Sequence, residues 1–258
     1  MKRSFFYLIL LSLYCFFSCE KTPAETEVNY NQLYQTSTIK ALLEGHYDGQ
    51  VTFAELAREG DLGLGTFNAL DGIFYQVKAN GKVDTVSMDM KTPFAMMTHF
   101  ATDTTVILNG DVNYVNFREL IDSVLPGTNL FYAFKIEGEF RELKIRSVPR
   151  QTPPYPPLAE VASDQTMIGL TRTTGTMVGF RSPGYAEDLT VPGYHLHFIS
   201  DDRQHGGHVL YFEGLNAQMY INYLTDLHIA LPTDSVFTGL NLEKDQREEL
   251  ERVESLND

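Results

Sequence analysis

The chain has 258 residues, of which 43% are hydrophobic and 12% aromatic, enough to bury a core as one large domain or two small ones. A largely disordered chain is therefore not expected. The 34 acidic residues outnumber the 20 basic ones and give a formal net charge of -14. That balance argues against nucleic acid or an anionic membrane surface as the main partner. An anionic small-molecule ligand would need a local positive group, either an arginine or a metal ion.

The start of the chain has the pattern of an export signal. Residues 1–18 combine a basic start with an apolar run that is too short to span a bilayer. The Ser-Cys pair that follows the run resembles a bacterial lipoprotein box, so we expect cleavage before Cys19 and acylation of its thiol, with ordinary signal cleavage as the alternative. Residues 19–31 are polar and would form a tether. The protein is thus predicted to be exported and lipid-anchored to a bacterial membrane, in the periplasm or at the cell surface. Because Cys15 is the only other cysteine, no disulfide is expected in the folded part.

Short helices are expected near the start of the domain. Ser37 or Thr38 could cap a helix that runs through Leu43 and stops at Gly45. A second short helix is expected to begin at Thr52, which is also a good capping residue.

Strands outnumber helices along the rest of the chain. Asn80-Gly81 supplies the positive φ angles of a tight turn, so the flanking segments are predicted to pair as a hairpin. Glu137-Gly138 is interpreted in the same way as the turn of a second hairpin. The predicted elements of this half are strands at residues 73–77, 83–86, 105–108, 130–136 and 140–148, and a helix at residues 114–125.

Five prolines between residues 149 and 157 exclude a helix or a central strand there, so we expect a connection between two halves. Beyond it the pattern predicts strands near residues 165–171, 176–180, 193–200, 208–215 and 218–224, and an amphipathic helix within residues 241–257. The predicted fold class is mixed α+β, dominated by β-structure, with a few short helices. We place an N-terminal sheet unit at residues 32–150 and a C-terminal sheet unit, with a terminal helix, at residues 151–258.

A cluster of histidines is the main candidate for chemistry. Side chains alternate faces along a strand, so His195 and His197 are predicted to project to the same side. The polar, glycine-containing stretch after residue 200 is suited to reverse the chain, and a hairpin would bring His208 beside that pair. Three neutral imidazoles with an open fourth position form the usual catalytic zinc arrangement, and nickel or cobalt would also fit. The other histidines are assigned no role, and one of them is expected to be exposed in the turn: His46, His99, His228 and, in the turn, His205.

On its own, a His-x-His pair could equally lie on the solvent face of a strand, but longer motifs resemble the acetolactate decarboxylase family. These motifs are Val191-Pro192-Gly193-Tyr194-His195-Leu196-His197-Phe198-Ile199-Ser200-Asp201-Asp202-Arg203, Gly206-Gly207-His208-Val209-Leu210, Gly63-Leu64-Gly65-Thr66-Phe67-Asn68 and Arg146-Ser147-Val148-Pro149-Arg150-Gln151. The resemblance covers essentially everything after the tether. It implies two packed sheet units, with a metal held by the three histidines of the second unit.

The resemblance also implies a reaction, the loss of carbon dioxide from 2-acetolactate to give acetoin, without an organic cofactor. Zinc or another divalent metal would act as the Lewis acid. Arg146 would bind the substrate's carboxylate, with Arg150 as a rival and a simple pairing with Glu142 as the structural alternative. Glu254 matches a carboxylate that the family contributes from its extreme C-terminus, although a solvated helix face would also explain it. Thr66 would lie at the edge of the site as a hydroxyl partner, or else be an ordinary turn residue.

One departure from the family pattern affects the expected activity. In the family, the Leu-Asp-Gly after the Gly-Thr-Phe motif runs into a glutamate and a short hairpin, but here Leu70-Asp71-Gly72 runs straight into Ile73. An active-site glutamate is therefore expected to be missing, and Asp71 is the nearest acid. The first reading is a working decarboxylase, and the alternative is a catalytically impaired metal-binding protein that binds a small hydroxy-keto acid. The motifs disfavour a metal hydrolase or oxygenase, and the resemblance is compatible with a homodimer.

Overall fold

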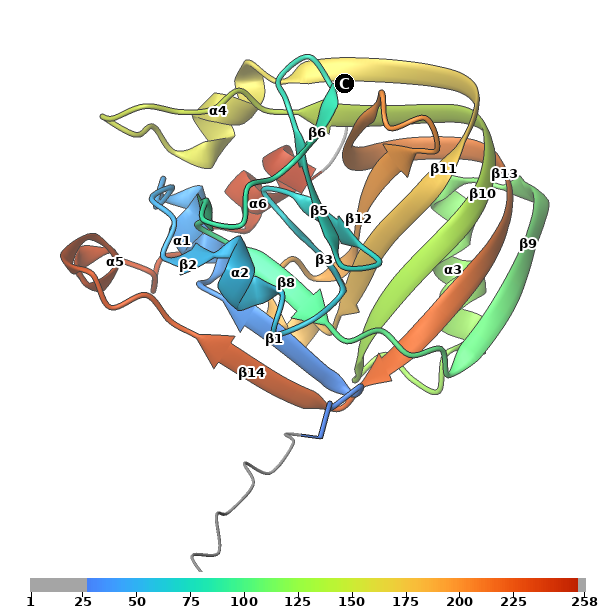
Figure 1. Cartoon of the computed structure of the whole chain (residues 1–258), viewed down its shortest axis with the longest axis horizontal. Helices are drawn as coiled ribbons and strands as arrows, with labels where there is room; N and C mark the ends of the chain where they lie inside the picture. Colours follow the sequence, from blue (N-terminus) through green and yellow to red (C-terminus); the bar gives the residue numbers. More distant parts are fainter. Residues whose placement is uncertain (1–26, 255–258) are drawn as a thin grey trace, which may run out of the picture.

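The computed structural model describes residues 27–254. The predicted signal peptide, Cys19 and residues 255–258 lie outside the described residues. Two large sheets make up most of the described chain, with short α-helices around them (Figure 1). This arrangement confirms the predicted mixed, β-dominated fold class.

The first sheet has seven strands, and all its pairings are antiparallel except the one between β1 and β14. Their spatial order is β14 (Asp226–Ala230), β1 (Gln32–Thr36), β8 (Ala95–Thr98), β3 (Leu62–Gly65), β4 (Asn68–Leu70), β5 (Ile73–Val77) and β6 (Val83–Thr85). The predicted hairpin is confirmed as β5 and β6, with Gly81 at a positive φ of 79° in the turn. A separate ribbon pairs β2 (Val51–Thr52) with β7 (Lys91–Thr92).

The second sheet has five strands, all antiparallel, and it curves back on itself because β10 and β13 also pair with each other. Their order is β10 (Phe131–Ser147), β11 (Thr166–Ser182), β12 (Gly193–Ser200), β13 (Gly206–Leu224) and β9 (Thr104–Val112). Figure 1 shows the long strands β10, β11 and β13 curving together. Since β9 and β10 precede residue 150 and β14 follows it, both sheets take strands from both halves of the chain. The domain boundaries stay a prediction.

The predicted second hairpin is wrong, because β10 is a single strand that continues through Glu137 and Gly138. A Cβ added at Gly138 would overlap the carbonyl oxygen of Asn216 and the Cβ of Ala217 on β13. The glycine therefore permits a close approach between two strands instead of making a turn.

Two more pairs of predicted strands are single continuous strands. Residues 165–171 and 176–180 belong to β11, and residues 208–215 and 218–224 belong to β13. Each strand has an irregular position near the predicted break, since Arg172 of β11 has a φ of 48° and Gly214 of β13 a φ of 66°. Positive φ at such positions bends a strand without ending it.

The helices begin and end with ordinary local signals. Both expected starts are confirmed, since Thr38 caps α1 and Thr52 forms a capping box with Glu55 at α2. The helices are α1 (Ile39–Leu43), α2 (Phe53–Leu56), α3 (Tyr114–Val124), α4 (Leu158–Ser163), α5 (Ser235–Gly239) and α6 (Arg247–Glu254), with a 3₁₀ turn at Gly184–Ala186. Within residues 27–254 no helix has both the length and the apolar character needed to cross a membrane.

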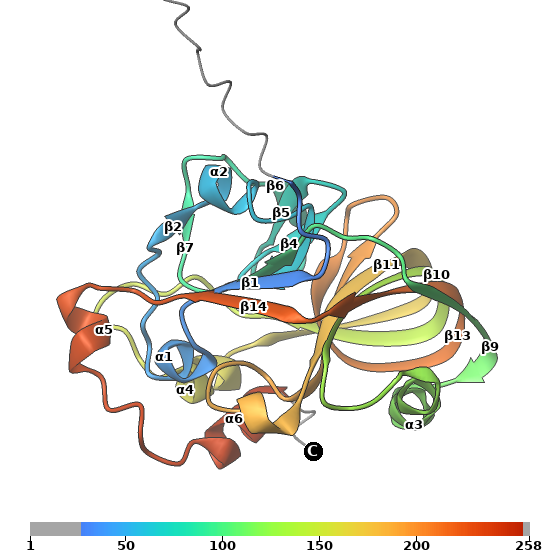
Figure 2. The same ribbon diagram turned by 90° about the horizontal axis from the view of Figure 1, so that it is seen from below.

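The hydrophobic core between the two sheets fixes the position of the last helix. It combines side chains from the seven-stranded sheet, such as Met96, with side chains from the five-stranded sheet, such as Phe180. Leu250 and Val253 of α6 are buried in the same core, together with residues of α1 and α4. Figure 2 shows α1, α4 and α6 grouped on one side of the molecule, while α3 lies beside the five-stranded sheet. This packing places the end of α6 beside β12 and β13.

Candidate metal centre

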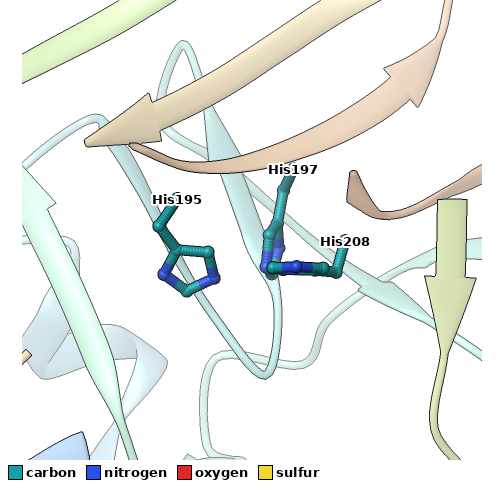
Figure 3. Close-up of side chains that lie close together, drawn as sticks. All are labelled: His195, His197 and His208. Carbon is teal, nitrogen blue, oxygen red and sulfur yellow. The ribbon is translucent and has the colours of Figure 1, made fainter. Parts of the chain in front are cut away.

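The three predicted histidines meet at one point. His195 and His197 are two residues apart on β12, so their side chains project from the same face. His208 on β13 lies directly opposite His197 in the antiparallel register. One ligand atom from each ring lies within 4.8 Å of the corresponding atoms of the other two. Figure 3 shows the three rings turned toward a common space. The predicted hairpin and the predicted convergence are both confirmed.

The same row of side chains continues onto a third strand. His208 pairs on its other side with Arg146 of β10, so the histidines and the arginine lie on one face. This register depends on a β-bulge, because Lys144 pairs with Tyr211 while Ile145 pairs with Val209, which leaves Leu210 as an extra residue. A regular ladder would place Arg146 opposite Val209 and so turn its side chain to the other face.

Glu254 reaches this row from the end of α6. Its carboxylate oxygens lie 3.7 Å from Arg146 Nη2, 3.5 Å from His208 Nε2 and 4.0 Å from His195 Nε2. Its side chain is 18% exposed. The alternative of a solvated helix face is therefore wrong for Glu254, although it holds for Glu248 on the same helix.

Burial makes the three imidazoles neutral. It lowers the pKa of His195 to about 3, and the positive charge of Arg146 acts in the same direction. Burial is likewise the main reason that the pKa values of His197 and His208 lie well below the ordinary value. Arg146 and the neighbouring histidines lower these pKa values further. At neutral pH the rings carry no charge, which is the form of histidine that binds metal ions.

The Arg146 guanidinium and the Glu254 carboxyl form a largely buried pair. Burial raises the pKa of the Glu254 carboxyl to about 7, while the charge of Arg146 opposes that rise. Arg146 is only 7% exposed, and its Nε has no hydrogen-bond partner among the described residues. A guanidinium remains protonated in proteins. Arg146 is therefore the fixed local positive charge that an anionic ligand requires in a chain of net charge -14.

The donor set fits a divalent metal ion. Within the described part of the chain, His195 Nδ1 and His208 Nε2 are buried and have no hydrogen-bond partner. Leaving such atoms unpartnered in a protein interior costs about 1–3 kcal/mol each. Three neutral imidazole nitrogens at this spacing are the ligands that zinc and related transition metals prefer. The residues present thus fit the metal that the sequence predicts.

Sequence reasoning missed Asn68, which contacts the cluster from the other sheet. It is fully buried at the start of β4, and its Oδ1 lies 2.7 Å from His197 Nδ1. The backbone of the preceding residue, Phe67, also hydrogen-bonds to His197. The Gly-Thr-Phe-Asn motif contained both residues, but nothing in one sequence indicates that this segment lies against β12.

The structure separates the other candidate residues. Thr66 is exposed, and its hydroxyl lies 2.9 Å from that of Thr92, just before the Phe67-Asn68 pair that contacts His197. Arg150 and Glu142 are both exposed, and Arg146 pairs with Glu254, so a simple Arg146–Glu142 pairing is wrong. The remaining histidines within residues 27–254 do not join the metal-binding group.

Asp71 does not replace the family glutamate at the centre. Asp71 and Gly72, with φ values of 50° and 77°, form the two-residue turn between β4 and β5. Positive φ at both positions is the geometry that Asp-Gly favours in a tight hairpin. The Asp71 carboxylate is 70% exposed and lies 3.4 Å from Lys135 Nζ on the surface. The shortened hairpin is therefore well formed and presents its acid to solvent.

Known proteins share both the sequence and the fold. The sequence model described as alpha-acetolactate decarboxylase matches residues 33–244. The chain is 40% identical over 232 residues to the alpha-acetolactate decarboxylase of Methylococcus capsulatus, a match that covers 87% of this chain and 89% of that protein. It is 42% identical over 229 residues to the alpha-acetolactate decarboxylase of Methanosarcina mazei, covering 86% of this chain and 80% of the relative.

A solved structure agrees with these matches. The crystal structure of alpha-acetolactate decarboxylase from Bacillus subtilis strain 168 superposes with a TM-score of 0.85 at 35% sequence identity, over 87% of this chain and 100% of that one. The sequence and the fold lead to the same conclusion. The chain belongs to the alpha-acetolactate decarboxylase family.

Proposed function

We propose that this protein is a metal-dependent carboxy-lyase that converts 2-acetolactate to acetoin and carbon dioxide. One observation supports this most directly: three neutral imidazoles share one face with a buried Arg146–Glu254 pair. The proteins it resembles over most of its length are alpha-acetolactate decarboxylases. In the reaction the bond between C2 and the carboxylate carbon breaks, and C2 takes up one proton.

His195, His197 and His208 would hold the metal, zinc or another divalent cation. The bound ion would supply Lewis-acid chemistry, stabilising negative charge on the substrate's oxygens. The protein supplies the remaining functions through side chains that already lie beside the triad.

Arg146 is the group suited to bind the substrate's carboxylate. Its guanidinium offers several donors in a planar fork that matches a carboxylate. Its unpartnered Nε leaves a donor free in the described structure, and its burial strengthens the attraction for an anion. Because Arg146 lies on the same face as the histidines, a carboxylate bound to it would leave the substrate's ketone and hydroxyl oxygens near the triad.

Glu254 is the group suited to deliver the proton to C2. Its carboxyl lies within 4.0 Å of two triad nitrogens and beside the arginine, so it borders the space that a bound substrate would fill. Among residues 27–254, no other carboxyl is placed within ion-pair distance of these groups. The electron pair left by the departing carboxylate is delocalised onto the neighbouring ketone until C2 is protonated.

Acetoin formation by the purified chain, supplied with zinc and 2-acetolactate, tests this proposal. His197→Ala should lose stoichiometric metal and at least a hundredfold in rate, about the loss expected when a catalytic group is removed. His205→Ala is the matched control, since His205 lies in the same hairpin but outside the metal group, and it should keep both. Equal rates from the wild type and His197→Ala would overturn the proposal.

The absent glutamate motivates a second candidate, a metal-binding protein that binds a small hydroxy-keto acid without turnover. The exposed position of Asp71 leaves no replacement acid in the β4–β5 turn. Stoichiometric metal with no acetoin at high enzyme concentration would support this candidate. Turnover at an ordinary enzymatic rate would exclude it, and partial turnover that increases when a glutamate-bearing hairpin is inserted after Gly72 would show a weakened enzyme.

We also propose that the protein is exported and anchored by a lipid on Cys19. The proposal is supported by the basic start, the short apolar run and the Ser-Cys pair of residues 1–19. Metabolic labelling with radioactive palmitate in a bacterial host should mark the wild-type protein in the membrane fraction. Cys19→Ala should lose the label, whereas Cys15→Ala, which alters the other cysteine, should keep it.

A further inference from the structure

Asn68 is the only side chain of the seven-stranded sheet with a hydrogen bond to a triad histidine in the described chain. It is 0% exposed, and its backbone is fixed by pairing with Leu64 on one side and Tyr75 on the other. The distance of 2.7 Å between its Oδ1 and His197 Nδ1 is that of a good hydrogen bond. The contact therefore joins a rigid strand of one sheet to a metal ligand of the other.

The chemistry of the two groups determines which atom carries the hydrogen. A carboxamide oxygen can only accept, so His197 Nδ1 must be the protonated nitrogen. The lone pair of the neutral ring is then on Nε2, which is left to bind a metal. An imidazole ring held in this way cannot rotate or change tautomer without losing a buried hydrogen bond.

The other two histidines have no such support from a side chain. His195 Nδ1 and His208 Nε2 are buried without hydrogen-bond partners within residues 27–254. In both rings the tautomer is not fixed by a neighbouring side chain. His208 has a backbone hydrogen bond with Glu254, so within residues 27–254 His197 is the ligand whose orientation is set by a side chain.

We propose that Asn68 is a positioning residue for the metal centre, which holds His197 in the Nε2-binding tautomer before the metal arrives. The inference rests on the proposed metal site and concerns metal affinity. Loss of a partner that orients a ligating histidine typically costs 10–100-fold in metal affinity. Because the hydrogen bond between His197 and the Phe67 backbone would remain, we expect a loss near the lower end of that range.

The test measures zinc affinity by competition with a chelator, on the purified chain and without substrate. Asn68→Leu, similar in size but lacking the acceptor, should bind zinc about tenfold more weakly. Asn68→Asp, which keeps an acceptor at the same place, should bind zinc within about threefold of the wild type or more tightly, since carboxylates are common partners of ligating histidines. Visible absorption of the cobalt-substituted protein gives a second readout, in which Asn68→Leu should shift the bands and Asn68→Asp should return them to the wild-type positions.

Asn222→Leu is the matched control. Asn222 is 1% exposed, and its amide bonds to Asp103 and Ala101 instead of to the triad. The Asn222→Leu variant should lose stability in the same way as Asn68→Leu but keep the zinc affinity of the wild type. If Asn68→Leu does not fold, Asn68→Ala and Asn222→Ala replace the pair.

The outcomes separate this inference from the proposed function. Wild-type protein that binds no zinc would overturn the metal site itself. Wild-type protein that binds zinc, together with an Asn68→Leu variant that binds it equally well, would overturn only the role of Asn68. An equal loss of zinc affinity in Asn222→Leu would also overturn it, because the effect would then be structural.

Discussion

Arg146 and His208 are neighbours because of one extra residue in β13. The bulge at Leu210 shifts the register with β10, and the shift turns Arg146 onto the face of the histidines. Burial is the main reason that the pKa of His195 is lowered, the guanidinium lowers it further, and the same guanidinium lies beside Glu254. A fixed positive charge beside three neutral ligands suits an anion that must approach an acidic protein.

Glu254→Gln should slow acetoin formation without removing the metal. The amide keeps the size of the side chain but cannot exchange a proton, and loss of a general acid typically costs about 10²–10⁴-fold. The imidazoles are unchanged, so the zinc content should stay at one per chain. Turnover and metal analysis on the same preparation measure the two effects.

Glu248→Gln is the control for that experiment, because Glu248 is exposed on the first turn of the same helix. It should behave as the wild type. A Glu254→Gln rate equal to that of the control would show that another group protonates C2.

Asp71→Asn tests whether the acid in the shortened turn contributes to catalysis. Its carboxylate is 70% exposed and pairs with Lys135, and surface pairs of this kind contribute little. We expect the turnover number to change by less than about twofold, the usual effect of a surface substitution. A loss comparable to that of Glu254→Gln would instead place Asp71 in the reaction.

At the scale of the elements, the sequence predicted a hairpin correctly where a glycine in the turn has positive φ, and wrongly where a glycine lies inside a strand. Asn80-Gly81 predicts the β5–β6 hairpin correctly, although Gly81 is the residue of the pair with positive φ, because the need for a glycine there is local. Glu137-Gly138 resembles a turn in the sequence but lies in mid-strand, because its glycine makes room for β13. Such a requirement is set by a strand about eighty residues away, so no local pattern can show it.

Gly138→Ala should therefore destabilise the protein. The added Cβ meets the backbone of Asn216 and the side chain of Ala217, and overpacking of this kind typically costs about 1–3 kcal/mol. Gly169→Ala is the control, since Gly169 lies on β11 with no atom within 4 Å of the added Cβ. It should be neutral, or more stable by up to about 1 kcal/mol.

Urea unfolding followed by circular dichroism measures both changes. A Gly138→Ala variant as stable as Gly169→Ala would mean that β10 and β13 separate easily at this point, contrary to their continuous pairing.

At the scale of the whole molecule, the candidate site is assembled from three separate parts of the fold. The His-x-His spacing on β12 and the polar turn before β13 predict the triad, because both depend only on strand geometry. The placement of Arg146 depends on a bulge, and that of Asn68 on the packing of two sheets, which periodicity cannot reveal. Glu254 was found through the family resemblance, since several acids on its helix are equivalent by composition.

The buried tyrosines are expected to lower the stability of the protein at alkaline pH. Burial raises the pKa of Tyr132 and of Tyr194 above the ordinary value near 10. Each hydroxyl donates a hydrogen bond, from Tyr132 to the Gly127 carbonyl at 2.6 Å and from Tyr194 to the Asp122 carboxylate at 2.7 Å. Tyr34, Tyr47 and Tyr114 have raised pKa values for the same main reason, burial.

A group whose pKa is higher in the folded state keeps its full stabilising effect below its unfolded pKa and loses that effect as the pH rises above it. Above pH 10 the unfolded chain releases protons that the folded chain retains, so each such tyrosine lowers the free energy of unfolding by about 1.4 kcal/mol per pH unit. Urea unfolding at intervals from pH 8 to pH 11 should therefore show constant stability up to about pH 9.5 and a steep fall beyond it. Tyrosinate absorbance from the buried rings should appear together with unfolding.

Tyr132→Phe should unfold at a lower urea concentration at pH 8, but its free energy of unfolding should fall less steeply above pH 10. A pH slope identical to that of the wild type would mean that Tyr132 ionises in the folded protein.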